Sequence, residues 1–227
     1  MTAAPRYDLY GPIHKAIRRF MNDTLQRLGA LDVADDAALG AALDQLDSLV
    51  AGLRRHLKHE NDFLHTAIEA RQPGGARGTA EEHVEHLESL AALEAEAAAL
   101  RSAPAEQRDQ RTARLYRHLA LLVAENLQHM HIEETANNAL LWTHYSDAEL
   151  MDIHDRLVGT IPPAEMMAWL RWMASSLAPA ELTGMLGGMR QKAPPEVFGG
   201  VLQTVRSCVD AQRWSVLERS LGLARAA

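Results

Sequence analysis

The chain has 227 residues, of which 47% are hydrophobic and 23% charged, and its formal net charge at pH 7 is −7. This balance is typical of a globular protein and argues against wholesale disorder. The negative charge argues against a general nucleic-acid binder, which must neutralise phosphates. Because no window approaches 18 uninterrupted apolar residues, we expect neither a transmembrane span nor a membrane partner. The single cysteine, Cys208, and the lack of a signal-like pattern in residues 1–20 favour a cytoplasmic protein.

The composition and periodicity predict an all-α fold. Aromatic residues make up only 5% of the chain, and no run of alternating β-branched residues occurs. Apolar residues recur at helical spacing over 12–28, 37–70, 79–100 and 107–141, with Thr79 and Glu82 at the spacing of a capping box. Four long amphipathic segments joined by short polar turns predict an up-down-up-down four-helix bundle over residues 1–145.

Residues 146–227 have a different pattern, which predicts an additional C-terminal region of short helices. Ser146 and Glu149 have capping-box spacing. Three further segments each begin with proline and carry glutamate in the first turn, which is typical of helix starts: Pro163-Ala164-Glu165, Pro179-Ala180-Glu181 and Pro195-Glu196. We interpret this region as one that packs on the bundle, mediates homo-oligomerisation or binds a protein partner.

Histidine is the most informative residue type. The chain has 11 histidines, and ten of them precede Ser146. In an antiparallel bundle the starts of the first and third helices lie at the same end as the ends of the second and fourth. All four predicted helices therefore bring histidine to one end of the bundle, through His14, His56, His83 with His86, and His129.

Several of these donors share a helix face with the predicted core. His56 and Glu60 are four residues apart, and His83 and His86 are three apart, so each pair lies on one side of its helix. Burying imidazoles and carboxylates without partners would cost several kcal/mol, and a bound cation removes that cost. Imidazole and carboxylate without thiolate favour iron, manganese or zinc over calcium or an iron–sulfur cluster. The number of donors favours two adjacent ions bridged by carboxylate.

The order of these donors along the chain forms a recognisable pattern. It consists of His14 after Gly11-Pro12, His56-x-x-x-Glu60, the pair His83 and His86, and His129 followed by Glu133-Glu134. Over residues from about 8 to 145 this pattern resembles the hemerythrin-like family, also called the HHE cation-binding domain. The resemblance implies a four-helix bundle with two non-haem iron ions joined by carboxylate and oxo or hydroxo bridges. Such centres bind dioxygen or serve in the sensing of oxygen, nitric oxide or iron.

Carried over position by position, the resemblance makes Glu60 a bridge and five histidines terminal ligands: His14, His56, His83, His86 and His129. Two departures leave alternatives open. The family spaces its third-helix pair four apart, whereas His83 and His86 are three apart, so one of them need not ligate. The family pattern selects Glu134 on the fourth helix, whereas helical periodicity favours Glu133, and both stay candidates.

Other residues receive simpler interpretations. Glu125 is predicted on the inner face, where it could orient a ligand histidine or form a salt bridge. His65 and His131 lie on the far sides of their helices from the nearest ligands, so we expect both at the surface. Cys208 follows an apolar pattern and is expected to be buried and inert.

The function expected from these residues is metal-dependent binding or sensing of dioxygen, nitric oxide or another diatomic. No base or nucleophile stands apart from the ligand set, so no substrate suggests itself. One alternative is a di-iron oxidase, a peroxidase or a nitric-oxide-handling enzyme on the same ligands. Another is a metal-responsive regulatory protein that docks a partner through residues 146–227.

Overall fold

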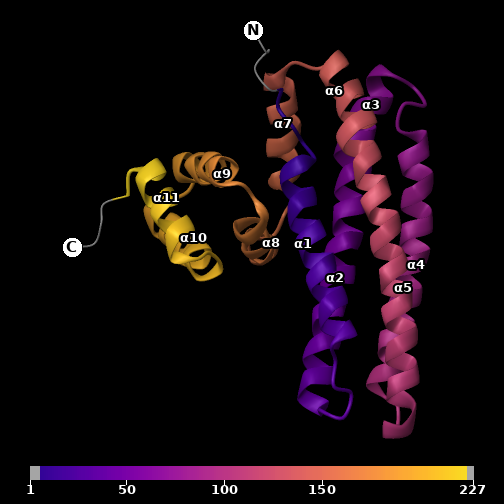
Figure 1. Ribbon diagram of the computed structural model, residues 1–227. Coiled ribbons are helices and arrows are strands. Elements are labelled where there is room, and N and C mark those ends of the chain that lie inside the picture. The colour runs from indigo at the N-terminus through magenta and orange to yellow at the C-terminus, as the bar shows by residue number, and fades with distance from the viewer. Residues whose placement is uncertain (1–5, 224–227) are drawn as a thin grey trace. The chain divides into compact units, whose positions relative to one another are not determined.

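The computed structural model describes residues 6–223, and within this range every regular element is helical (Figure 1). The predicted all-α fold is therefore confirmed. By their internal contacts the described residues divide into two units, 6–10 with 20–159 and 11–19 with 160–223. We call these the bundle unit and the second unit. The first helix, α1 (Gly11–Gly29), contributes to both units.

Three long helices dominate the bundle unit: α2 (Asp36–His59), α4 (Arg77–Arg101) and α5 (Ala105–Ile132). They alternate in direction, and α4 packs against both α2 and α5 (Figure 1). The second half of α1 joins them, because the Gln45 amide nitrogen lies 2.8 Å from an Asp23 carboxylate oxygen and 3.0 Å from the Thr24 hydroxyl. Leucines fill the interior, among them Leu46, Leu93 and Leu119, which are fully buried.

The second and fourth predicted helices are not continuous. After α2, a π-helical turn η1 (Glu60–His65) leads into α3 (Thr66–Arg71). After α5, a π-helical turn η2 (Glu133–Asn137) leads into α6 (Asn138–His144). A π turn bonds residue i to i+5 instead of i+4, so it inserts an extra residue and rotates everything after it around the axis. Residues beyond each turn therefore face directions that an α-helical pattern does not give.

One predicted helix start is correct and another is wrong. Ser146 and Glu149 form the expected capping box at the start of α7 (Asp147–Val158). Thr79 and Glu82 do not form one, because α4 already begins at Arg77 and Thr79 is buried inside it. The Thr79 hydroxyl lies 3.1 Å from the Ala76 carbonyl oxygen instead.

Helix α7 packs with the bundle unit. Its Leu150 and Ile153 share a buried cluster with Tyr10, Ile68 and Leu141. The contacts thus divide the chain after Gly159, whereas the boundary predicted from the sequence follows Tyr145. The outermost parts of the two predicted regions, residues 1–5 and 224–227, lie outside the described residues.

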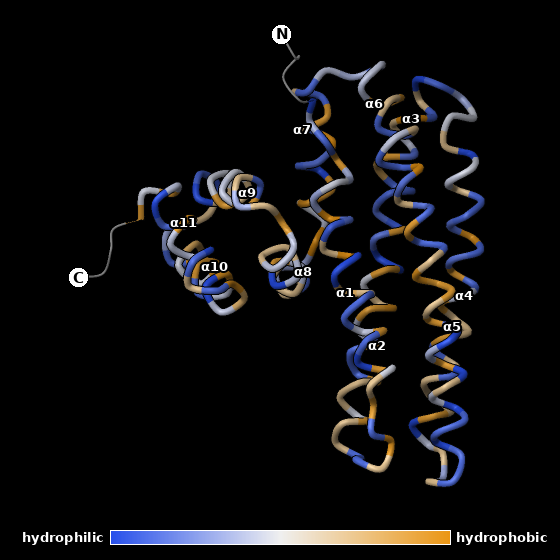
Figure 2. The backbone as a smooth tube through the Cα atoms, viewed as in Figure 1, coloured by the Kyte–Doolittle hydropathy of each residue, from blue (hydrophilic) through white to orange (hydrophobic). Residues whose placement is uncertain are grey.

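The second unit contains α8 (Pro163–Ser176), α9 (Pro179–Lys192), α10 (Pro195–Cys208) and α11 (Ala211–Leu221). The three predicted proline starts are confirmed. Hydrophobic residues recur along each of these helices (Figure 2). Leu170, Leu186 and Val205 belong to a separate buried core that these helices form. Cys208 is only half-buried at the edge of this core, so its predicted full burial is wrong. No described helix has the length and apolarity that crossing a membrane requires.

Candidate metal centre

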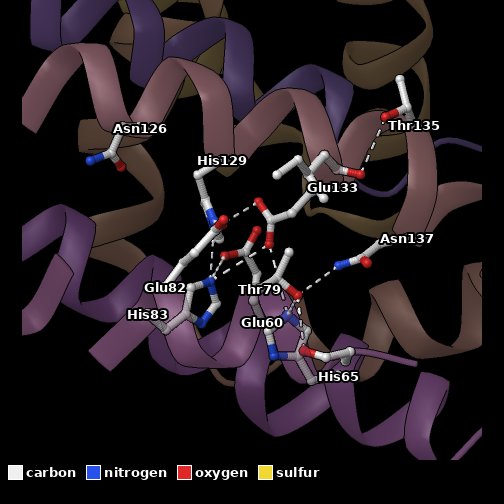
Figure 3. A network of polar contacts seen from close by, with 12 residues as sticks. Glu60, His65, Thr79, Glu82, His83, Asn126, His129, Glu133, Thr135 and Asn137 are labelled. Carbon is white, nitrogen blue, oxygen red and sulfur yellow. Dashed lines mark hydrogen bonds and ion pairs between the residues drawn. The ribbon is translucent and has the colours of Figure 1, made fainter. Parts of the chain in front are cut away.

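Four buried donors gather at the end of the bundle unit that contains the π turns. They are His83 of α4, His129 of α5, and the first residues of the two π turns, Glu60 and Glu133. One ligand atom from each lies within 4.8 Å of the others. Figure 3 shows the two imidazoles turned toward each other, with the carboxylates beside them. Both π turns thus begin at a carboxylate of this group.

The separations between donor atoms suit coordination of a single ion. The Nε2 atoms of His83 and His129 are 2.9 Å apart. Glu133 lies 3.3 Å from His129 Nε2 through Oε2 and 3.6 Å from His83 Nε2 through Oε1. Two ligand atoms that are each about 2.1 Å from a metal ion lie about 3–4 Å from each other. The three side chains are therefore spaced as neighbouring ligands of one ion.

The hydrogen bonds on the far side of each ring fix its tautomer. His129 Nδ1 lies 2.6 Å from a Glu82 carboxylate oxygen, and His83 Nδ1 lies 2.9 Å from the Asn61 side-chain oxygen. Both acceptors require that Nδ1 carries the hydrogen, so each neutral ring presents a bare Nε2 lone pair. Two lone pairs 2.9 Å apart repel unless a cation lies between them. The donor set therefore fits a metal ion, and a proton takes that place when no metal is bound.

The charges around His129 agree with this conclusion. Burial alone would lower the pKa of His129, but Glu133, Glu82 and Glu60 outweigh burial and raise this pKa to about 9. Burial likewise would raise the pKa of Glu133, but the neighbouring histidines, His129 first and then His65 and His83, hold it well below its usual value. The metal-free site is therefore an ion pair between imidazolium and carboxylate, with a strong affinity for positive charge.

Glu60 has the arrangement of a bridging carboxylate. Its Oε1 lies 3.1 Å from His56 Nε2, and its Oε2 lies 3.6 Å from His83 Nε2. The two oxygens of one carboxylate thus face two different histidines. An ion at each histidine would share Glu60 between them.

Three further predicted ligands, His14, His86 and Glu134, do not belong to the four-donor group. His14 is fully buried in the part of α1 that groups with the second unit, so its role at the centre stays a prediction. His86 is buried with its ring edge-on to His129, centroids 4.9 Å apart, but it does not belong to the four-donor group. Burial and the neighbouring His129 and His83 lower the pKa of His86 to about 4, so it is neutral. Glu134 is half-buried and lies outside this group, whereas Glu133 is fully buried within it.

The structure corrects two predictions and confirms a third. His65 is buried and lies 3.8 Å from Glu133, because the π turn η1 rotates it toward the interior, so its predicted surface position is wrong. Glu125 is exposed and the neighbouring Asn126 is buried in its place. The carboxylate that orients His129 is Glu82, which lies 47 residues away and has no local sequence signal. His131 is exposed, as predicted.

Tyr10 is a further residue near the centre that sequence reasoning missed. It is fully buried in the core cluster of the bundle unit. Burial and then the charges of Glu133 and Glu60 raise the pKa of its phenol well above the usual value. A neutral phenol is thus buried close enough to the centre to feel the charges of both carboxylates.

Comparison with protein families agrees with this geometry. The family model of the Hemerythrin HHE cation binding domain matches residues 7–141, and the chain belongs to this family. Searches of curated proteins and of solved structures found no match. All four members of the buried donor group lie within the matched range.

Glu82→Gln tests the contact that orients His129. The substitution preserves shape but removes the charge, and we expect the affinity for the bound metal to fall about 10–100-fold. A competition titration against a chelator measures the change. Glu85→Gln, at an exposed position on the same helix, is the matched control and should leave the affinity unchanged. Equal affinities in the two variants would contradict the assignment.

The ion pair also predicts how the stability of the metal-free protein depends on pH. Because folding raises the pKa of His129 from 6.5 to about 9, its contribution is fully present below pH 6.5 and is lost as the pH rises through 9. We expect the free energy of unfolding to fall by an amount on the order of 1–3 kcal/mol across this window. Denaturant titrations measure it, and Glu133→Gln should flatten the dependence. An unchanged slope in that variant would refute the ion pair.

Proposed function

We propose that this member of the HHE cation-binding family is a non-haem di-iron protein that binds dioxygen or another diatomic such as nitric oxide. The observation that carries the proposal is the buried group of two imidazoles and two carboxylates whose ligand atoms lie within 4.8 Å of one another. Its two facing Nε2 atoms need a cation, and the matched family model describes a cation-binding domain.

The proposed ligands fall into two sets. His83, His129 and Glu133 would hold one ion, as their mutual distances support. His56 and His14 would hold the other, with Glu60 shared because its two oxygens face different histidines. We place His86 and Glu134 outside the coordination sphere, since neither belongs to any cluster of donors, among the described residues, whose ligand atoms are close enough to share an ion.

The chain's own residues determine what such a centre can do. Imidazole with carboxylate ligands suits iron, manganese or zinc, and bound iron would supply reversible redox chemistry to the site. Glu82 holds the His129 ring in one tautomer. Leu53 and Leu90 are buried on the helices that carry His56 and His83, and they limit the access of water. A donor set with more imidazole than carboxylate favours reversible binding over strongly oxidising chemistry, which supports a binding or sensing protein. The single cysteine, Cys208, fits a reducing compartment, and we propose that the protein acts in the cytoplasm.

Metal analysis of aerobically purified protein tests the proposal. We expect about two irons per chain and near-ultraviolet bands of an oxygen-bridged iron pair. His129→Ala should lose most of the iron, whereas His131→Ala, two residues away and exposed, should retain it. Equal iron content in both variants, or no iron after anaerobic reconstitution, would refute the proposal. Sustained consumption of peroxide or nitric oxide would favour an enzyme over a binding protein.

His14→Ala tests the second ion separately. If His14 helps to hold the ion beside His56, the variant should bind about one iron per chain instead of about two, as expected for a di-iron bundle with one site disabled. Iron quantification together with the loss of the oxygen-bridge bands measures this. Retention of both irons would show that His14 is not a ligand.

A further inference from the structure

The two π turns that begin at the carboxylates also end at a common point. Glu60 opens η1, which ends at His65, and Glu133 opens η2, which ends at Asn137. The side chains of His65 and Asn137 both reach the hydroxyl oxygen of Thr79 on α4, at 3.2 Å and 3.1 Å (Figure 3). One hydroxyl group therefore joins the ends of two turns that lie on different helices.

The hydrogen-bond directions at Thr79 are determined by its chemistry. A hydroxyl has one hydrogen and two acceptor lone pairs. The hydrogen goes to the Ala76 carbonyl oxygen, 3.1 Å away, so the oxygen accepts from Asn137 Nδ2 and from His65 Nε2. Thr79, His65 and Asn137 are all buried, so the hydroxyl makes all three of its possible hydrogen bonds inside the protein, away from solvent. We call these three residues the Thr79 clasp.

The same contacts hold His65 against the metal centre. Its Nε2 lies 3.8 Å from Glu133 Oε1, and its ring stacks on the ring of His83 with centroids 4.8 Å apart and an interplanar angle of 19°. Asn61, also in η1, accepts a hydrogen bond from His83. The turn η1 is therefore fixed to α4 at two points, through His65 to Thr79 and through Asn61 to His83.

These turns require such support. A π turn is rare and occurs mostly as a single turn, frequently at functional sites. A rare and costly backbone conformation persists where many surrounding contacts hold it in place. If either turn reverted to α-helical spacing, the residues after its carboxylate would rotate away and the clasp would break. By holding the ends of both turns, the clasp fixes the positions of Glu60 and Glu133 relative to each other.

We propose that Thr79, through His65 and Asn137, is the positioning residue that holds both carboxylates in register for a shared pair of metal ions. The part of this inference that concerns metal rests on the proposed function. The structural part concerns the two turns alone and does not depend on a bound ion. Thr79 itself would touch no metal and would act through the ends of η1 and η2.

Thr79→Val tests the clasp, because valine keeps the shape and removes the hydroxyl. Hydrogen exchange of the metal-free protein should become at least about tenfold faster in both Glu60–His65 and Glu133–Asn137. Affinity for added iron should fall about 10–100-fold, and Thr79→Ser, which restores the hydroxyl, should recover both properties. Thr112→Val is the matched control, because Thr112 is also buried and its hydroxyl has no hydrogen-bond partner. It should change neither measurement.

The outcomes separate this inference from the proposed function. Faster exchange in both turns with weaker iron binding supports the clasp, whereas unchanged exchange or a change in one turn alone overturns it. If the unsubstituted protein binds no iron, the proposed function fails and the exchange measurement still decides whether the clasp exists. If Thr79→Val does not fold, Asn137→Ala serves as the test instead, because it removes one of the two hydrogen bonds that the Thr79 hydroxyl accepts. Unaltered exchange in η2 of that variant would overturn the clasp.

Discussion

The structure of the bundle unit depends on one electrostatic constraint. Two imidazole nitrogens, Nε2 of His83 and of His129, face each other 2.9 Å apart in a buried site. The acceptors Asn61 and Glu82 assign the hydrogen of each ring to the opposite nitrogen. The pair is therefore stable only with positive charge between the rings. A proton satisfies this requirement in the metal-free state, as the raised pKa of His129 indicates, and a metal ion satisfies it with more ligands.

The rest of the fold keeps this constraint in place. The carboxylates that complete the group begin two π turns, so the backbone departs from α-helical geometry where the donors are needed. The ends of the turns meet at Thr79, and Glu82 fixes the His129 ring. Buried leucines such as Leu53 and Leu90 lie on the helices that carry His56 and His83. The polar network is thus supported by residues that would contact no ion themselves.

Much of this arrangement can be predicted from the sequence, because it follows from helical periodicity. The four-residue spacing of His56 with Glu60 and of His129 with Glu133 places each pair on one helix face, and proline and serine mark the starts of the later helices. Prediction fails where periodicity changes. A helical wheel assumes α-helical geometry throughout, so it placed His65 outside, although η1 turns it inward.

Contacts between distant residues are the other part that the sequence does not reveal. Glu82 resembles a capping residue of Thr79 in the sequence, yet it pairs with His129 on another helix. Thr79 itself resembles a helix cap, yet it joins two other elements. Neither role has a local pattern, because each depends on how separate helices pack.

Anomalous diffraction at the iron edge, from crystals of the iron-loaded protein, tests the central claim most directly. The account predicts two peaks about 3.5–4 Å apart, one of them in contact with the Nε2 atoms of both His83 and His129. A single peak elsewhere, or no peak between those two rings, would contradict it.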